Sequence, residues 1–195
     1  MLHTGALWGY YAWIKGHQTM TANRYPDCLE FVLRAEGGYV NDPLDHGGAT
    51  NQGITQRTYD DWQESHGLPL HSVRLISAEE VAAIYRNHYW RRILGDDLPP
   101  RIDLMVFDTA VQHGVSRASK WLQAVVMSPV DGVVGYKTLY AVNDYVMRNQ
   151  IKVMIDDYMD MRNAFYAGVV ARDPTQARFR KGWSRRMYRL SSALL

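Results

Sequence analysis

The sequence lacks the features that mark disulfide-framed and membrane-spanning proteins. Its 195 residues include one cysteine, Cys28, so an intrachain disulfide is impossible and a secreted module held by disulfides is excluded. Because Cys28 stands beside Leu29 and close to Phe31 and Val32, we interpret it as a buried, small apolar side chain. No apolar run reaches the roughly 18 residues that a membrane-spanning helix needs, so we expect no stable membrane insertion.

Motifs for metals and nucleotides are missing as well. The seven histidines form no His-Glu-x-x-His pattern, and the single cysteine rules out a cysteine cluster. The sequence also has no glycine-rich loop of the kind that holds phosphates. We therefore expect neither a metal nor a cofactor.

Acidic residues are absent between Pro174 and Leu195, although the net charge of the whole sequence is only +2. Such a basic stretch suits contact with an anionic polymer, which can be a nucleic acid, an acidic cell wall or a membrane surface. The simpler alternative is the solvated face of a last helix, and the sequence leaves both open. The basic residues of this stretch are Arg178, Arg180, Lys181, Arg185, Arg186 and Arg189.

The remaining composition is that of an ordinary globular protein, with 47% apolar and 22% charged residues in one domain or two small lobes. Residues 1–20 form an N-terminal extension with an apolar, aromatic-rich run from Gly5 to Ile14. No basic residue precedes this run and no clear cleavage site follows it, so we predict no signal peptide.

Helical patterns dominate the chain, and the predicted fold class is mostly α with one small β-hairpin near the N-terminus. Leu29, Val32, Leu33 and Glu36 share one face of a first helix that begins at Pro26 and that Gly37-Gly38 should end. The turn-rich segment 39–54 predicts an irregular hairpin. A further helix is expected to begin at a capping box at Ser77, with Val81, Ile84, Tyr85 and His88 on one face. Pro99-Pro100 predicts a break before a helix over 102–113, and Ser116 is the predicted cap of a helix over 116–126. The remaining helices are expected over 55–66, from about 137, over 143–171 and over 175–193.

Glu36 is the strongest candidate for a catalytic residue. At the C-terminal end of a helix the dipole favours cations, and partial burial disfavours a charge, so both should raise the pKa of Glu36. A carboxyl group that stays protonated near neutral pH suits a general acid that must protonate a weakly basic oxygen. Gly37 and Gly38 would let a bulky sugar chain approach closely. From its position alone, Glu36 is equally well explained as a solvated residue at a helix end.

A second carboxylate, Asp45, follows nine residues later in the turn-rich segment. Carried on a hairpin that faces Glu36, Asp45 and the hydroxyl of Thr50 would hold a water molecule on the far side of a sugar ring. This is the two-carboxyl arrangement of glycoside hydrolysis. Taken singly, Asp45 before a histidine and two glycines also reads as a turn residue, and Thr50 as a strand residue.

The run from Glu36 to Thr55, EGGYVNDPLDHGGATNQGIT, resembles the signature of glycoside hydrolase family 108. The family is lysozyme-like and contains N-acetylmuramidases, among them phage endolysins and muramidases that assist protein secretion. The resemblance implies a two-lobed helical fold and maps the catalytic glutamate onto Glu36. Asp45 matches the aspartate that manages the attacking water in phage-type lysozymes. Thr50 matches the accompanying threonine less well, and Asn51 is the alternative.

The second half of the chain resembles the predicted peptidoglycan-binding domain that often follows family 108 segments. The resemblance rests on Asp108 to Val115, Trp121 to Ala124, and the Asp-Gly-x-x-Gly-x-x-Thr pattern that begins at Asp131. It implies an extension at 1–20, a catalytic segment at 21–100 and a peptidoglycan-binding segment at 101–195 that completes the substrate cleft. The glycines of the last pattern are also explained by turn geometry alone.

Several polar and aromatic residues are candidates for binding the glycan. Asp108, Gln112 and His113 share a helix face that either lines a cleft or forms a buried polar network between helices. Tyr39 and Tyr89 either stack on sugars or pack in the core. The full set of predicted substrate-binding residues is Gly37, Gly38, Tyr39, Asn51, Tyr89, Asp108, Gln112 and His113.

We therefore predict a muramidase that hydrolyses the β-1,4 bond from N-acetylmuramic acid to N-acetylglucosamine, with Glu36 as general acid and Asp45 assisting. The alternatives are a lytic transglycosylase that uses the same glutamate, a non-catalytic wall-binding protein, and a nucleic-acid binder that uses the basic C-terminus. The predicted partner is the peptidoglycan glycan strand, with no nucleic acid, and the expected state is a monomer. Made in the bacterial cytoplasm, such an enzyme acts on the wall in the periplasm.

Overall fold

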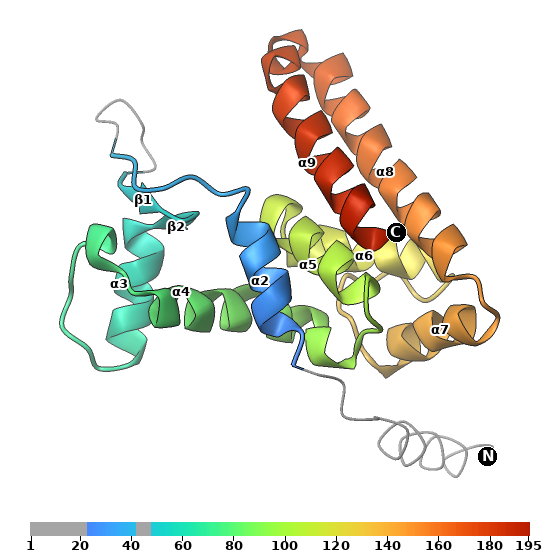
Figure 1. Cartoon of the computed structure of the whole chain (residues 1–195), viewed down its shortest axis with the longest axis horizontal. Coiled ribbons are helices and arrows are strands. Elements are labelled where there is room, and N and C mark those ends of the chain that lie inside the picture. The colour runs from blue at the N-terminus through green and yellow to red at the C-terminus, as the bar shows by residue number, and fades with distance from the viewer. Residues whose placement is uncertain (1–22, 42–47) are drawn as a thin grey trace.

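The computed structural model describes residues 23–41 and 48–195 of the chain (Figure 1). The predicted extension at 1–20 and the predicted catalytic residue Asp45 lie outside these residues. The fold is mostly α with one small antiparallel sheet, as predicted. Its helices are α2 (Tyr25–Leu33), α3 (Gln56–Ser65), α4 (Ala78–Tyr85), α5 (Ile102–His113), α6 (Val115–Val125), α7 (Tyr136–Met147), α8 (Ile151–Arg172) and α9 (Arg180–Leu194), and its strands are β1 (Thr50–Asn51) and β2 (Ile54–Thr55).

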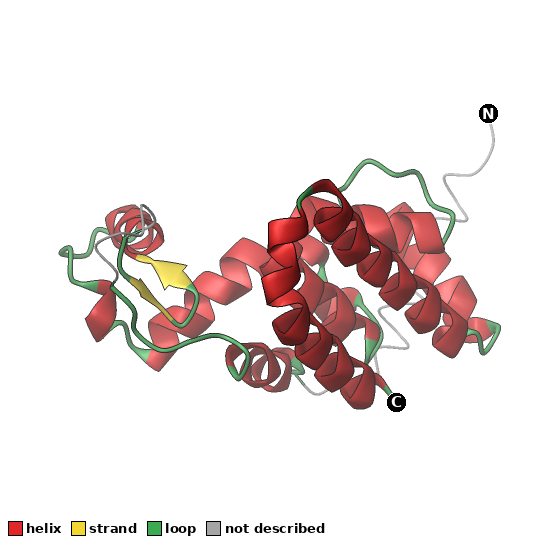
Figure 2. Cartoon of the chain, turned by 90° about the horizontal axis from the view of Figure 1, so that it is seen from above, coloured by secondary structure: helices red, strands yellow, loops and turns green. Residues whose placement is uncertain are grey.

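The elements form a smaller and a larger lobe. The hairpin β1–β2, α3 and the start of α4 make up the smaller lobe, and α5 to α9 make up the larger one (Figures 1 and 2). Helix α2 lies between them, and α8 and α9 stand side by side at the opposite side of α2 from the hairpin. In the described part of the chain, none of the helices is long and apolar enough to span a membrane.

The hairpin is held in place by its turn and by one buried amide. Gln52 and Gly53 both have positive φ, at 49° and 76°, which is the backbone of a two-residue type I′ turn. Cross-strand pairing joins residue 50 to 55 and residue 51 to 54, and Val40 forms a further bridge to Thr50. The side chain of Asn51 donates to the carbonyl of Val73 at 3.1 Å. A small hairpin near the N-terminus is thus confirmed, but its strands of two residues each span 50–55, at the end of the predicted range 39–54.

Two helices begin at side-chain caps, and the one at Ser77 was predicted. The side chain of Thr55 accepts from the amide of Thr58 at the start of α3. Ser77 and Glu80 form the complete capping box of α4. After Tyr85 the chain widens into a π-helical turn over Arg86–Trp90. This turn shifts the buried face, so that His88 is exposed and Trp90 is fully buried, which corrects the predicted position of His88.

Helix α2 ends earlier than the glycine pair predicts. It stops at Leu33, and the amides of Ala35 and Glu36 bond three residues back, to Val32 at 2.9 Å and to Leu33 at 3.1 Å. Tight turns therefore replace the helix before Gly37 is reached. Glu36 lies beyond the end of α2 and is not part of its apolar face.

Helix α5 is the centre of the molecule, and its predicted bounds are confirmed. Every residue from 102 to 110 is buried, because α2, α6, α9 and the turns before α5 pack around it. Three polar residues lie in this buried stretch, Asp103, Asp108 and Thr109. Buried polar groups are stable only with hydrogen-bonding partners. We therefore expect the polar side chains of α5 to bond to neighbouring elements.

The C-terminal helices differ from the prediction at their boundaries. Helix α6 begins at Val115 after Gly114 and has no side-chain cap, so Ser116 is not the capping residue. The helix predicted over 143–171 is divided between α7 and α8, because Asn149 takes a positive φ of 57°. Helix α9 begins only at Arg180. Before it, the side chain of Asp173 caps a 3-10 turn over Pro174–Phe179.

Candidate active site

Glu36 lies in the segment between α2 and the hairpin, and 21% of its side chain is exposed. Its Oε1 accepts a hydrogen bond of 2.8 Å from Nη1 of Arg186. Arg186 belongs to α9, 150 residues further along the chain, and only 10% of its side chain is exposed. The predicted acid is therefore held by a cation from the last helix.

Arg186 is itself bound to α5. Its Nε donates to Oδ1 of Asp108 at 2.9 Å, and Nη2 lies 2.9 Å from the same oxygen. The other carboxylate oxygen of Asp108 accepts from Nη1 of Arg162, on α8, at 2.6 Å. Both Asp108 and Arg162 are fully buried. One ionic network thus joins the segment after α2 to α5, α8 and α9.

The charges of this network balance. It contains two carboxylates, on Glu36 and Asp108, and two guanidinium groups, on Arg162 and Arg186. Burial lowers the pKa of Arg186, but Asp108 and Glu36 raise it by more, and the pKa ends above its usual value. Arg186 is therefore a permanent cation beside Glu36.

The second oxygen of Glu36 lies on the hairpin side. A Cβ atom placed on Gly53 would be 3.2 Å from Glu36 Oε2 and 2.6 Å from the hydroxyl oxygen of Tyr85. That hydroxyl donates to the carbonyl of Gln52 at 2.8 Å. The bare backbone of Gly53 thus borders Oε2, and Tyr85 fixes the hairpin turn against this position.

The negative charge of Glu36 affects the pKa of two nearby tyrosines. Burial, and after it the negative charge of Glu36, raise the pKa of both Tyr85 and Tyr89. Both phenols consequently remain neutral donors at physiological pH. Their ring centroids lie 5.5 Å apart, and Tyr89 is partly buried, so this predicted glycan-binding residue lies close to Glu36.

The other predicted residues near the hairpin have different surroundings. Gly37 and Gly38 are exposed, and a Cβ atom on either would meet nothing within 4 Å. Tyr39 is 39% exposed, with the guanidinium of Arg74 over its ring. Thr50 is partly buried and pairs through its backbone with Val40. The amide nitrogen of Asn51 is used within the fold, so this side chain anchors the hairpin and does not face a ligand through that atom.

The predicted polar face of α5 forms the buried network. Asp108 has no exposed surface and both its oxygens are occupied by arginines, which corrects its prediction as a glycan ligand. Gln112 accepts from Arg162 and from the hydroxyl of Tyr166, the latter at 2.8 Å. Nε2 of His113 is 3.1 Å from the Tyr166 hydroxyl. Burial first, and then the nearby arginines, lower the pKa of His113 to about 3.

Four residues around Glu36 and Asp108 were not predicted as site residues: Arg162, Arg186, Tyr85 and Gly53. Arg186 stood in the basic stretch at the C-terminus, but nothing in its local sequence distinguishes it from its neighbours. Tyr85 was predicted only as part of an apolar helix face. For Gly53, the Gln-Gly pair between two short strands was an available signal of a tight turn.

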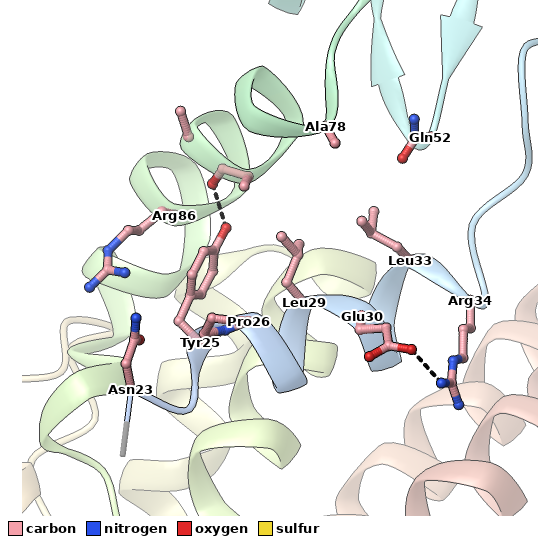
Figure 3. A pocket seen from close by; sticks show the side chains of 12 residues that line it. Asn23, Tyr25, Pro26, Leu29, Glu30, Leu33, Arg34, Gln52, Ala78 and Arg86 are labelled. Carbon is pink, nitrogen blue, oxygen red and sulfur yellow. Dashed lines mark hydrogen bonds and ion pairs between the residues drawn. The ribbon is translucent and has the colours of Figure 1, made fainter. Parts of the chain in front are cut away.

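An open groove of about 720 Å³ lies between α2, α4 and the hairpin turn (Figure 3). Figure 3 shows that Tyr25, Leu29 and Leu33 of α2 form one wall, with Ala78 of α4 and Gln52 of the hairpin turn opposite. The hydroxyl of Tyr25, which lines the groove, donates to the carbonyl of Ala82 of α4. Glu36 is not among the residues that line this groove, whereas Gln52 of the hairpin turn is.

Comparisons with known proteins match nearly the whole described chain. The model of the family Glycosyl hydrolase 108 matches residues 29–114, and the model Predicted Peptidoglycan domain matches residues 117–188. Among solved structures, SagA from Brucella abortus is 37% identical, with a TM-score of 0.69, over 87% of this chain and 93% of that one. The curated proteins include no match to the sequence. Glu36 and Asp108 lie in the first matched segment, and Arg162 and Arg186 lie in the second.

Proposed function

We propose that this chain, which belongs to the glycosyl hydrolase 108 family, is an N-acetylmuramidase. The family and the peptidoglycan domain make it a glycoside hydrolase that acts on peptidoglycan. It cleaves the β-1,4 bond from N-acetylmuramic acid to N-acetylglucosamine, with Glu36 as the general acid. The observation that carries the proposal is the position of Glu36, which is partly exposed, bonded through one oxygen to Arg186 and bordered at the other by Gly53, which has no side chain.

The chemistry follows from one proton transfer. Protonated Glu36 gives its proton to the bridging oxygen, the bond from that oxygen to the anomeric carbon of N-acetylmuramic acid breaks, and the oxygen keeps the electron pair. The positive charge left on the sugar is captured by water. Asp45, with Thr50, is the proposed group that orients this water. Asp45 lies outside the described residues, so its role rests on its place in the sequence.

The peptidoglycan segment is proposed to complete the site as well as to bind the wall. Proposed as 101–195, it contributes α9, which brings Arg186 to Glu36 of the catalytic segment, and α5 and α8, whose Asp108 and Arg162 lie behind Arg186. The candidate substrate ligands on the surface side of Glu36 are Gly37, Gly38, Tyr39 and Tyr89, all of which have exposed or partly exposed surface. Gln112 and His113 adjoin the ionic network and have some exposed surface.

Product analysis tests the proposed bond. Purified Gram-negative peptidoglycan is digested with the wild type and with Glu36→Gln, which keeps the size of the side chain and removes the acid, and the fragments are identified by mass spectrometry. We expect fragments with reducing N-acetylmuramic acid ends from the wild type alone. Anhydro ends would replace the muramidase by a lytic transglycosylase with the same acid. Reducing N-acetylglucosamine ends would contradict the proposed bond.

A further inference from the structure

We propose that Arg186 is a positioning residue that holds Oε1 of Glu36 and thereby makes Oε2 the oxygen that donates the proton. This inference rests on the proposed function, in which Glu36 is the general acid. It assigns to the C-terminal segment a part in the reaction itself, in addition to binding of the wall.

The first argument is the hydrogen-bonding chemistry of arginine. A guanidinium group has only donors and no acceptor. Oε1 of Glu36 accepts from Nη1 of Arg186 at 2.8 Å, so a proton on Oε1 would have no acceptor in that direction. When Glu36 is protonated, the proton therefore resides on Oε2. That oxygen borders Gly53, which has no side chain to obstruct a sugar.

The second argument is that Arg186 cannot move freely. Its Nε is bonded to Asp108, and Asp108 is bonded to Arg162. The last two residues are fully buried, and Arg186 is only 10% exposed. Three helices thus fix the guanidinium before a substrate arrives, which is the kind of support that a catalytic group needs from its surroundings.

The third argument concerns charge. Three groups face Glu36 from the elements around it: Arg186 of α9, Tyr85 of α4 and Tyr89 of the following turn. Asp108 of α5 and Arg162 of α8 lie behind Arg186. Protonating Glu36 leaves the balanced network with one excess positive charge. Arg186 therefore stabilises the carboxylate that forms as the proton passes to the bridging oxygen.

These arguments predict a particular kinetic pattern for Arg186→Gln. Because the orientation and the charge stabilisation are both lost without the cation, kcat falls by about tenfold to hundredfold. KM changes little, since Arg186 bonds Glu36 and Asp108 and does not need to touch the sugar. Arg186→Lys keeps the charge but not the paired hydrogen bonds of the guanidinium group, so kcat recovers only in part.

Arg24→Gln is the matched control. Arg24 pairs with Asp103, another buried carboxylate of α5, with 2.5 Å between its Nε and the carboxylate oxygen, and it has no bond to Glu36. This variant also removes one cation from a buried aspartate, so it reports what loss of such a pair does to the fold alone. We expect a lower melting temperature, with kcat and KM of the folded protein unchanged.

The experiment measures kcat and KM of the four proteins on soluble glycan strands, together with their melting temperatures and the activity of Glu36→Gln. The pattern above would support the positioning role. The inference is overturned if Glu36→Gln is inactive while Arg186→Gln keeps the wild-type kcat. It is equally overturned if Arg186→Gln and Arg24→Gln lose activity only in proportion to their stability. An active Glu36→Gln would instead remove the proposed function itself.

Discussion

At the scale of single residues, the site depends on a glycine that was visible in the sequence only as part of a motif. Gly53 has a φ of 76°, and a Cβ atom there would approach both the Tyr85 hydroxyl and Oε2 of Glu36. For a residue other than glycine, the left-handed backbone costs about 1–2 kcal/mol. The clash comes in addition: a Cβ atom would lie 2.6 Å from the Tyr85 hydroxyl oxygen, and it would also lie 3.2 Å from Oε2 of Glu36, the oxygen from which we propose the proton leaves.

Gly53→Ala is therefore expected to lower activity by more than about tenfold, beyond its effect on stability. Gly67→Ala provides the control, because Gly67 has a similar φ of 65° and open space around its would-be Cβ. Gly67→Ala should lose about 1–2 kcal/mol of stability and keep wild-type activity, whereas Gly53→Ala should lose more stability because the clash adds to the backbone cost. Hydrolysis rates and urea unfolding curves measure the two quantities. Equal activity of the two variants would contradict the close approach of Gly53 to the reacting group.

Residues differ in how far the sequence predicts them. Glu36 was identified by its motif, because the spacing to the turn-rich segment is local. Arg186 was not, because its bond to Glu36 spans 150 residues and the stretch around it is uniformly basic. The expectation for Glu36 was an acid at a helix end without a cation. The contact with Arg186 could emerge only from tertiary packing.

At the scale of elements, α5, α8 and α9 are joined by buried charges. Arg162 and Asp108 are both fully buried and lie 2.6 Å apart. Removing one partner of a buried ion pair leaves the other without full compensation, which typically costs about 3–5 kcal/mol. This link sets the position of α8 and, through Asp108, that of Arg186.

We accordingly expect Arg162→Met to lose about 3–5 kcal/mol of unfolding free energy. Lys152→Met tests the specificity of this effect, because Lys152 lies on the same helix and pairs with Asp156 at an exposed site, four residues away. That variant should lose only about 0.3–0.5 kcal/mol. Chemical denaturation of both proteins decides the matter. A loss for Arg162→Met as small as that for Lys152→Met would contradict a structural role of the buried pair.

Elements with strong local signals were predicted best. The capping box of α4 and the bounds of α5 were correct, because caps and the Pro-Pro break act within a few residues. The end of α2, the π-helical turn at Arg86–Trp90 and the break at Asn149 were missed. At each of these places no glycine or proline marks the change.

At the scale of the whole molecule, His113 makes stability depend on pH. The pKa of His113 is about 3 in the folded protein, compared with 6.5 for the free side chain. Between these values the unfolded chain binds a proton that the folded protein does not. Lowering the pH from 6.5 toward 3 therefore favours unfolding, and the stability contributed by neutral His113 is complete only above pH 6.5.

His113→Gln should make this dependence weaker, since glutamine can bond Tyr166 and does not titrate. Urea unfolding of the wild type and the variant at pH 7 and pH 5 measures the effect. We expect the wild type to lose more stability than the variant between the two values. The same slope in both proteins would show that His113 is not kept neutral by the fold.

The whole molecule also shows why family and site are not equally predictable. The sequence motifs identified both matched segments, which adjoin between residues 114 and 117. They gave no indication that the second segment supplies a residue bonded to Glu36. The ionic network crosses that boundary twice, through Arg162 and Arg186.

The most direct test of Glu36 as the general acid compares two glutamates of the same segment. Release of dye from labelled peptidoglycan is measured for Glu36→Gln and for Glu30→Gln, in which an exposed glutamate of α2 loses its surface pair with Arg34. Glu36→Gln is expected to release dye at least about a hundredfold more slowly than the wild type, and Glu30→Gln to stay within about twofold. A rate for Glu36→Gln close to that of Glu30→Gln would contradict the central role of Glu36.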